Sequence, residues 1–319
     1  MIKKILYKMK KYLLIPSLIF ASPSQGFQKA EKKAFPGLSY ENEKNWKEPF
    51  FFIQMADCQL GFIEENRSWD EEIRLLEKAV DQINQLHPKF VILCGDLVHA
   101  FPREPMREEQ IADFKKIACR IDPAIPLICL CGNHDVGNQP DRSTIAMYEN
   151  DFGAHYFSFW VGGTQGIVLN SSLIWDPTNA QDLYAEQIDW FQNQLEFDRE
   201  NPPVHRFVFA HHPWFVKDIE EEDFYFVIPK KRRRKFLDLM KEADVSACFC
   251  GHYHRNALAD YDGMPVITTS AVGKQLGDDV SGFRIVNVFE DRIEHEYVIL
   301  EPNKIEDLSP SRLENPRNI

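Results

Sequence analysis

The chain has 319 residues and a formal net charge of −12, and 44% of its residues are hydrophobic. This apolar content is sufficient for a packed core, and the length fits one large or two ordinary domains. The acidic balance argues against non-specific nucleic-acid binding, which depends on a basic surface. An anionic substrate would need local positive charge, which bound cations can supply.

The first 45 residues differ in composition from the rest of the chain. Lysines precede an apolar run near residues 12–21, an order typical of a signal peptide, although the run is too short to span a bilayer as a helix. We expect residues 1–45 to be a leader and linker, residues 46–302 to form the main domain, and residues 303–319 to be a flexible C-terminal tail. A disordered extension is favoured over a cleaved or tethering segment.

Several of the seven cysteines lie inside predicted core strands. This placement is typical of small buried side chains in a reduced protein and favours a cytoplasmic location over a disulfide framework. Secretion or membrane tethering through the leader is the alternative location. A sulfur metal site at Cys129-x-Cys131 or Cys248-x-Cys250 is less favoured than packing.

Short β-rich runs alternate with helical patterns in the first half of the chain. The helix expected at 71–86 carries apolar residues at helical spacing, so one face packs on a sheet. This alternation predicts parallel β-α-β units with right-handed crossovers. In chain order the expected elements are strand 50–56, helix 71–86, strand 90–94, helix 108–120 and strand 126–131.

The pattern changes after residue 142. Gly162-Gly163 and Asp262-Gly263 are hairpin signals, and the last four strands are short and meander-like. Two sheets packed face to face, with helices outside, account best for this mixture. The expected elements are strands 156–161 and 166–169, helix 181–197, strand 206–210, a surface helix from 230, strand 245–250, and strands 257–261, 266–269, 283–289 and 293–298.

Five of the predicted strands end in residues that can bind a metal or move a proton. A single such turn could merely cap a helix, but five in one chain favour a functional site at the carboxyl ends of the strands. The five strand ends carry Asp57-Cys58-Gln59, Gly95-Asp96, Gly132-Asn133-His134-Asp135, His211-His212 and Gly251-His252-Tyr253-His254.

Mixed oxygen and imidazole ligands without a thiolate suit Mn, Fe or Zn. The candidates are too many for one ion, so we expect two divalent cations roughly 3.5–4 Å apart with a hydroxide between them as nucleophile. Asp96, on the central strand, is the expected bridge. His134 is placed to protonate the leaving oxygen, with Asp135 or another carboxylate orienting it.

The order Asp-x-Gln, Gly-Asp, Gly-Asn-His-Asp, His and Gly-His-x-His resembles that of the calcineurin-like metallophosphoesterases. From about residue 34 to 300 the chain is similar to the calcineurin-like phosphoesterase domain-containing protein family. The resemblance implies a four-layer α/β/β/α sandwich of two mixed sheets and a two-metal protein-serine/threonine phosphatase acting on a phosphoprotein. The stretches that carry it are 51–61, 94–100, 156–163, 251–257 and 275–277.

By motif position, the resemblance implies one ion held by Asp57, Gln59, Asp96 and His254, and another held by Asp96, Asn133, His211 and His252, with His134 as general acid. Gln59 stands where the superfamily usually has histidine. An amide oxygen is a weaker donor than an imidazole, so we expect lower affinity at that ion and a preference for harder cations such as Mn or Mg.

The substrate is less well specified than the chemistry. The stretch Gly-Asp-Leu-Val-His-Ala lacks the aspartate and arginine found there in calcineurin-type protein phosphatases, so His99, Arg255 and Asn256 are the candidates to hold the phosphate. Cyclic-nucleotide or other phosphodiester hydrolysis is an alternative reaction. A catalytically weak, metal-dependent interaction module is an alternative of another class.

Three further features have ordinary and functional interpretations. The acidic and aromatic segment 218–226 could be a solvated loop or the rim of a substrate site. The basic run at 230–235 is expected to begin a surface helix rather than to form an anion-binding patch or a nuclear signal. His212 is expected to be a turn residue rather than a group that supports the site.

Overall fold

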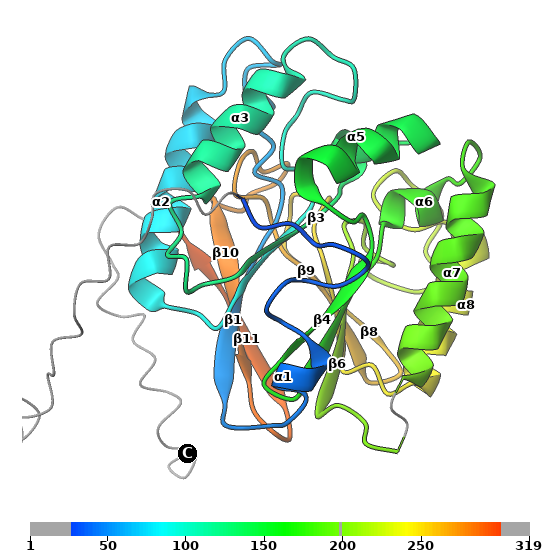
Figure 1. The fold of residues 1–319 in the computed structure, drawn as a ribbon. Helices are drawn as coiled ribbons and strands as arrows, with labels where there is room; N and C mark the ends of the chain where they lie inside the picture. Colours follow the sequence, from blue (N-terminus) through cyan, green and yellow to red (C-terminus); the bar gives the residue numbers. More distant parts are fainter. Residues whose placement is uncertain (1–26, 198–199, 301–319) are drawn as a thin grey trace, which may run out of the picture.

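Two mixed β-sheets lie face to face at the centre of the computed structural model, which describes residues 27–197 and 200–300 (Figure 1). The first sheet has the strand order β11-β10-β1-β2-β3 and the second β4-β5-β6-β7-β9-β8. Helices α2 and α3 cover the first sheet, and α7 and α8 cover the second. The predicted four-layer α/β/β/α fold is therefore confirmed.

The predicted strands and helices follow the predicted order, with bounds that differ by a few residues, and the structure adds four helices that were not predicted, α1, α4, α5 and α6. The strands are β1 (Phe50–Met55), β2 (Val91–Cys94), β3 (Leu127–Leu130), β4 (Phe157–Val161), β5 (Thr164–Val168), β6 (His205–Phe209), β7 (Ala247–Cys250), β8 (Ala257–Tyr261), β9 (Met264–Thr268), β10 (Gly282–Val288) and β11 (Ile293–Ile299). The helices are α1 (Tyr40–Glu43), α2 (Asp70–Leu86), α3 (Arg107–Ala118), α4 (Asn133–Val136), α5 (Arg142–Phe152), α6 (Ser171–Trp175), α7 (Gln181–Glu196) and α8 (Lys230–Glu242).

Helix α2 shows how local sequence fixes an element. Its first turn is acidic, which suits the positive end of the helix dipole. Leu76, Val80 and Ile83 recur at helical spacing and are buried against the first sheet. The helix ends at His87, whose φ of 51° is the left-handed conformation common at helix ends.

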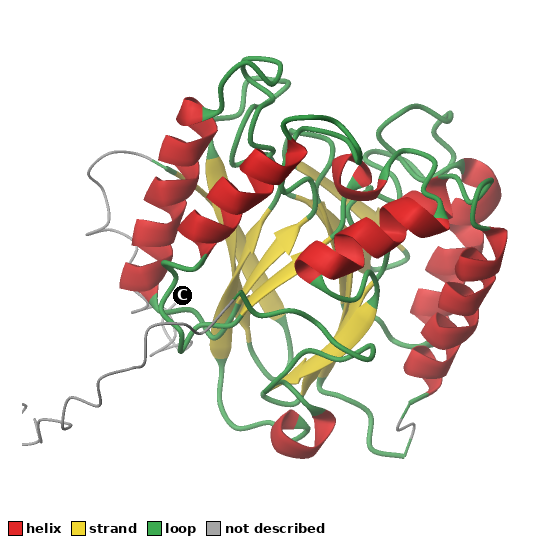
Figure 2. Ribbon diagram, turned by 45° about the horizontal axis from the view of Figure 1, so that its top comes forward, coloured by secondary structure: helices red, strands yellow, loops and turns green. Residues whose placement is uncertain are grey.

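Parallel pairing puts the carboxyl ends of the motif-bearing strands at one edge. Strands β1, β2 and β3 are parallel neighbours in the first sheet, and β5, β6, β7 and β9 are parallel neighbours in the second. The turned view shows both sheets between the outer helices (Figure 2). This topology brings the loops after β1, β2, β3, β6 and β7 together.

Both predicted hairpin turns are present. Gly162 and Gly163 have φ values of 52° and 84° and join β4 to β5, while Asp262 and Gly263 have φ values of 50° and 86° and join β8 to β9. Positive φ at both central residues is the requirement of the tight hairpin turn that matches strand twist.

The last four strands do not form one meander, and that expectation is wrong. Strands β8 and β9 belong to the second sheet, whereas β10 crosses to the first sheet and pairs with β1. This antiparallel pairing, Phe50 opposite Val288, buries β10 between β1 and β11. Such a long-range contact leaves no local signature.

Aromatic side chains fill the space between the sheets. Phe52 is fully buried and stacks on Phe90, with ring centroids 4.7 Å apart, and it meets Phe249 edge to face at 5.4 Å. Phe207 and Phe209 also lie about its ring, with centroids 6.0 Å away in each case. The two sheets are thus joined through one aromatic cluster.

Replacing Phe52 by alanine is expected to lower the free energy of unfolding by about 3–5 kcal/mol, because it leaves a cavity at the centre of this cluster. Leu258→Ala is a matched control, since Leu258 is 64% exposed on edge strand β8; it should change stability by less than about 0.5 kcal/mol. Urea denaturation measures both. Equal effects would contradict the assignment of the core.

The folded unit extends further toward the N-terminus than the predicted boundary at residue 46. Phe35 and Leu38 are buried, and the backbone amide of Trp160 donates to the Leu38 carbonyl at 2.9 Å. Residues 27–45 therefore pack on β4 instead of forming a linker. The signal-like run at 12–21 and the expected tail at 303–319 lie outside the described residues.

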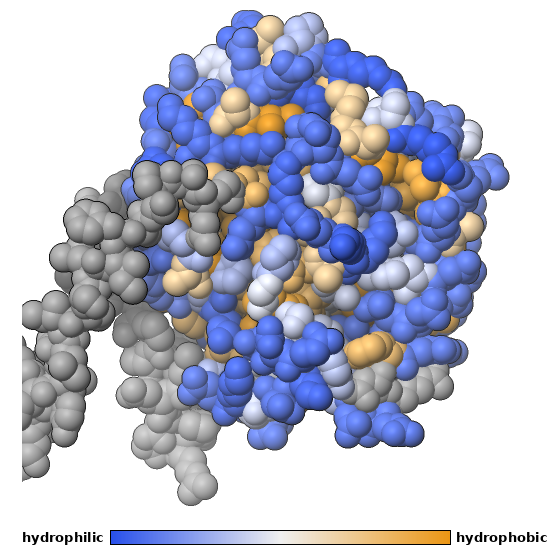
Figure 3. Space-filling model, viewed as in Figure 1, coloured by the Kyte–Doolittle hydropathy of each residue, from blue (hydrophilic) through white to orange (hydrophobic). Residues whose placement is uncertain are grey.

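Two surface properties complete the description. Hydrophilic residues cover most of the face shown in Figure 3, with apolar residues between them. Among residues 27–197 and 200–300, no helix has the length and apolar character needed to cross a bilayer.

All seven cysteines are unpaired. The metal-ligating clusters found in this part of the chain contain no thiol, so the sulfur alternative gains no support.

Candidate metal centre

The seven predicted ligands converge where the two sheets meet at the carboxyl ends of their strands. They follow five different strands, and none of them is more than 3% exposed. Such burial of charged and imidazole groups is expensive unless they are paired or bind a cation. The ligands are Asp57 and Gln59 after β1, Asp96 after β2, Asn133 after β3, His211 after β6, and His252 and His254 after β7.

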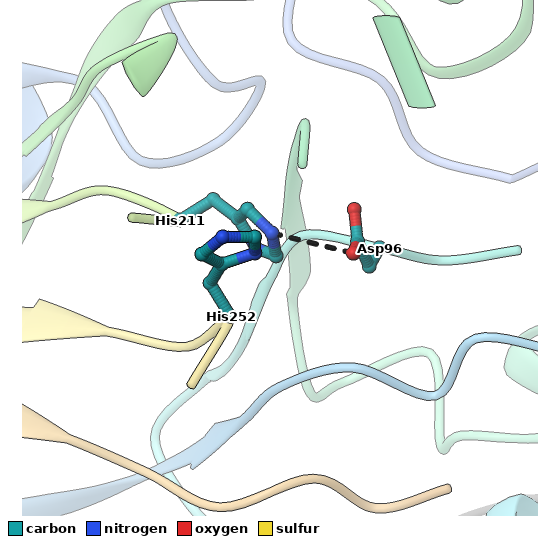
Figure 4. Close-up of side chains that lie close together, drawn as sticks. All are labelled: Asp96, His211 and His252. Atoms are coloured by element: carbon teal, nitrogen blue, oxygen red, sulfur yellow. Dashed lines mark ion pairs between the residues drawn. The ribbon is translucent and has the colours of Figure 1, made fainter. Parts of the chain in front are cut away.

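One group of donors surrounds the position of the second implied ion. Asp96, His211 and His252 each place one donor atom within 4.8 Å of the others (Figure 4). His211 Nε2 lies 3.3 Å from Asp96 Oδ2 and 3.0 Å from Asn133 Oδ1. The structure therefore brings together all four residues predicted for this ion.

A second group surrounds the position of the first implied ion. Asp57, Asp96 and His254 also place donor atoms within 4.8 Å of one another, and His254 Nε2 lies 3.4 Å from Asp57 Oδ1. Asp57 Oδ1 and Gln59 Oε1 are buried and accept no hydrogen bond from the described residues. Buried acceptors without partners are costly, and a cation would satisfy them.

Two of the histidines have their ring orientation fixed by a hydrogen bond from Nδ1 to a backbone carbonyl. His211 Nδ1 donates to the Cys94 carbonyl at 2.8 Å, and His254 Nδ1 donates to the Lys274 carbonyl. Because a carbonyl can only accept, Nδ1 carries a proton, and Nε2 is the nitrogen that would bind a cation. Metal-binding histidines commonly have such a partner on the other nitrogen, so the donor set fits two divalent cations that share Asp96.

The glycines of the motifs are required by close packing. A Cβ at Gly132 would lie 2.1 Å from Asp96 Oδ1, and a Cβ at Gly251 would lie 2.8 Å from Asp57 Oδ2. Several ligands also adopt the left-handed backbone conformation, which non-glycine residues rarely use and which concentrates at functional sites. These ligands are Asp57, Gln59, Asp96, His252 and His254.

The buried charges perturb one another strongly. Burial alone would raise the pKa of Asp96, but the imidazoles of His211 and His134 outweigh it and lower the pKa well below its usual range. Burial alone would lower the pKa of His211, but Asp96 raises it to about 9. Without a cation the two groups form a buried ion pair, so a bound cation would displace the imidazolium proton.

His134 lies beside the metal ligands and is held by stacking. Its ring packs between His99, with centroids 4.8 Å apart, and Phe101, at 4.2 Å. His134 Nδ1 donates to the His99 carbonyl at 2.5 Å, which leaves Nε2 to exchange a proton. The His134 backbone amide donates to Asp96 Oδ1 at 2.9 Å, so the backbone at His134 is tied to the shared carboxylate.

The orienting role expected of Asp135 is corrected by its contacts. Its carboxylate accepts from the amides of Leu97 at 3.1 Å and Gly132 at 2.7 Å, which joins the loops after β2 and β3. Burial and the nearby Asp96 raise the pKa of Asp135 to about 7. The His99 carbonyl, rather than a carboxylate, orients the His134 ring.

The three residues predicted to hold the phosphate have different surroundings. His99 is stacked between Phe62 and His134, and its Nδ1 lies 3.3 Å from Gln59 Nε2. Burial and the neighbouring His134 lower the pKa of His99 to about 4, so the ring is neutral and can accept from the Gln59 amide. This contact turns the oxygen of Gln59, and not its nitrogen, toward the cluster.

Arg255 and Asn256 are engaged in holding the loop after β7. Arg255 donates to the carbonyls of Tyr253 at 3.3 Å and Leu276, and Asn256 Oδ1 accepts from Arg284 at 2.7 Å. These contacts tie the loop to the segment that follows β9. A role for either residue in substrate binding stays a prediction.

Changing Gln59 to histidine is expected to raise the affinity for the first cation by tenfold or more, with the largest gain for Zn, because imidazole is the better donor. Gln28→His is the control, because Gln28 is exposed and belongs to neither donor group. Isothermal titration with Mn and Zn measures the change. Unchanged affinity in Gln59→His would contradict the assignment of Gln59 as a ligand.

Sequence reasoning misjudged one histidine. His212, expected to be a turn residue, is buried, and its Nδ1 lies 2.9 Å from Ser171 Oγ. Its ring packs on His252 with centroids 4.2 Å apart, so it helps to hold the ring of this predicted ligand in place. The burial of its ring and its bond to Ser171 arise only in the folded chain, although its position beside His211 could have suggested them.

Sequence reasoning also missed a tyrosine beside the ligands. Tyr225 belongs to the segment 218–226, which we call the rim segment, and its Oη accepts from Asn133 Nδ2 at 3.0 Å. Its ring also meets His252, with centroids 5.0 Å apart. The position of the rim segment between two ligand loops was the available signal.

The basic run begins α8, as predicted, and three of its six basic side chains, Lys230, Arg233 and Arg234, form ion pairs with acidic residues of the rim segment. Arg233 is fully buried and donates to the carbonyls of Ile219 at 2.6 Å and Ile228 at 3.1 Å. Lys230 and Arg234 form ion pairs with Glu220. The basic run thus holds the rim segment in place through hydrogen bonds and ion pairs, and does not present a free anion-binding patch.

Comparison with known proteins agrees with this arrangement. The sequence model of the calcineurin-like phosphoesterase family matches residues 52–256. The serine/threonine-protein phosphatase CPPED1 of Danio rerio is 42% identical over 288 residues, covering 87% of this chain and 93% of its own length. That of Homo sapiens is 41% identical over 287 residues, covering 86% and 91%.

A solved structure shows the same fold at low sequence identity. A dimetal phosphatase from Danio rerio superposes with a TM-score of 0.59 at 15% identity, covering 80% of this chain and 98% of its own. The matched family region contains all seven predicted ligands and His134. The chain therefore belongs to the calcineurin-like phosphoesterase family.

Proposed function

We propose that the chain is a dinuclear metallophosphatase that hydrolyses phosphomonoesters, with phosphoserine and phosphothreonine side chains of proteins as its substrates. The observation that carries the proposal is that Asp96 belongs to both groups of buried donors, the arrangement that two neighbouring cations require. When bound, such a pair supplies positive charge to the phosphate and acidifies water.

The donor set favours Mn, Fe, Zn or Mg. One side of Asp96 carries a second carboxylate, an amide oxygen and one imidazole, namely Asp57, Gln59 and His254. The other side carries two imidazoles, His211 and His252. The first set is richer in oxygen and suits the harder cations, while the second suits the borderline ones.

His134 acts in this proposal as the general acid. Its Nδ1–H is held by the His99 carbonyl, so Nε2 gives its proton to the departing serine or threonine oxygen. Protonation matters for these alcohols because their alkoxides are poor leaving groups. The phosphoprotein substrate is supported by the two named relatives, which the chain covers over more than nine-tenths of their length.

The test is turnover by protein stripped of metal and reloaded with Mn, Fe, Zn or Mg. We expect hydrolysis of phosphoserine and phosphothreonine peptides and of p-nitrophenyl phosphate, with at least about tenfold lower kcat/KM on bis-p-nitrophenyl phosphate. Preference for the diester would instead favour a phosphodiesterase. Tight metal binding without turnover of any ester would favour an interaction module.

A further inference from the structure

Tyr225 lies where the rim segment meets the metal centre. The side chain is 44% exposed, yet its hydroxyl reaches the predicted ligand Asn133 at 3.0 Å. Trp175 packs edge to face against the ring, with centroids 6.2 Å apart, and His252 also contacts it, with centroids 5.0 Å apart. The residue therefore has a solvent-facing part at the mouth of the site and a polar atom beside the ligands.

The hydrogen bonds of Asn133 determine whether the Tyr225 hydroxyl can donate a hydrogen bond to another group. The Asn133 amide donates to Tyr225 Oη and, at 2.9 Å, to Asn138 Oδ1, so its own oxygen is left on the side of His211. A phenol has one hydrogen and two lone pairs. The Tyr225 hydroxyl also contacts the Asn138 side chain. Because Asn133 donates to Oη, the phenol keeps its own hydrogen, which can be donated to an acceptor beside the second ion position.

The rim segment is fixed before any substrate arrives. Buried Arg233 of α8 donates to the carbonyls of Ile219 and Glu221 within the segment and of Ile228 just after it. The Glu221 carboxylate accepts from the amide of Val216 at 2.9 Å. A group held by such contacts loses little conformational entropy on binding.

The three residues predicted to hold the phosphate are each engaged in contacts within the site. The Arg255 guanidinium and the Asn256 amide oxygen are occupied by backbone and Arg284 contacts, as described above. The side chain of His99 is stacked and bonded to Gln59. Tyr225 offers a further donor from outside the motifs, because its hydroxyl lies beside the predicted ligand Asn133.

We propose that Tyr225 is a substrate-binding residue whose hydroxyl donates a hydrogen bond to a phosphate oxygen of the substrate. The inference rests on the proposed function, since it assumes a phosphate at the shared-aspartate centre. It adds to the site a contact from the rim segment, which belongs to none of the motifs.

The deciding variant is Tyr225→Phe, which keeps the ring against His252 and Trp175 and removes only the hydroxyl. A hydrogen bond to a charged group predicts a loss of roughly tenfold to a hundredfold in kcat/KM on a phosphoserine peptide. Inorganic phosphate should bind the Mn-loaded protein more weakly by a similar factor. Affinity for Mn, measured by calorimetry, should stay within about twofold.

Phe224→Leu is the matched control, because Phe224 is 40% exposed on the same segment and its ring contacts Phe226. It should leave kcat/KM and phosphate affinity unchanged. Unchanged values in Tyr225→Phe would overturn the proposal. So would a loss of Mn affinity large enough to explain the lost activity, since Tyr225 would then act by holding Asn133.

Failure of the proposed function can be told apart from failure of this inference. Turnover of the phosphopeptide by the unaltered protein tests the function alone. Phosphate binding to the Mn-loaded protein and to Tyr225→Phe tests the tyrosine without any turnover. Equal phosphate affinity in the two proteins would refute the role of Tyr225 whatever the physiological reaction.

Discussion

Asp96→Asn is expected to lower kcat/KM by on the order of a thousandfold or more, because it removes the one charge that both ions share. Asp96 is the residue common to the two groups of donors, and its Oδ2 lies 3.3 Å from His211 Nε2. Asparagine has nearly the same shape, and its oxygen can still accept from the His134 amide. The variant should therefore fold normally but lose metal binding and activity.

Metal content separates this expectation from simple misfolding. Elemental analysis should find two ions per chain in the unaltered protein and fewer than two in Asp96→Asn. Asp291→Asn is the control, because Asp291 is 77% exposed and forms its ion pair, within the described part of the chain, with neighbouring Arg292; it should keep both ions and full activity. Full metal content and turnover in Asp96→Asn would contradict the bridging role.

Most of the fold was predictable because its signals are local. The period of α2, the two hairpin turns and the buried strands can all be seen within windows of a few residues. The site was predictable for the same reason, since each ligand follows directly on a strand. Asp96 and Asn133 could thus be placed at one edge before their contacts were known.

The remaining features depend on contacts between distant parts of the chain. The pairing of β10 with β1 joins residues 50 and 288, and only packing of the complete sheet specifies it. Asp135 looked like a partner for His134 because the two are adjacent, yet its carboxylate turns to the Leu97 amide. Adjacency in sequence gave no information on where either side chain points.

The rim segment illustrates the same limit. In the sequence, its acidic residues indicate a solvated loop. The basic run of α8 indicates the charged face of a surface helix. The ion pairs between them form only in the folded chain, as does the hydrogen bond that Arg233 donates to the Ile219 carbonyl. Tyr225 therefore reaches Asn133 through long-range packing that no motif records.

His134→Gln is expected to lower kcat on a phosphoserine peptide by about a hundredfold to ten-thousandfold, with KM and metal content unchanged. The imidazole is held between His99 and Phe101, and glutamine cannot deliver a proton from that position. His87→Asn is the control, because His87 is exposed at the left-handed end of α2, a conformation that asparagine adopts readily. It should retain full activity.

The leaving group distinguishes an acid from a merely structural histidine. The p-nitrophenolate ion leaves without protonation, so His134→Gln should lose much less activity on p-nitrophenyl phosphate than on the peptide. A structural defect would lower both activities together and would release metal, because the His134 amide is bonded to Asp96. An equal loss on both substrates would therefore contradict the role of general acid. A loss confined to the serine ester, with both ions retained, would place the proton on His134 Nε2.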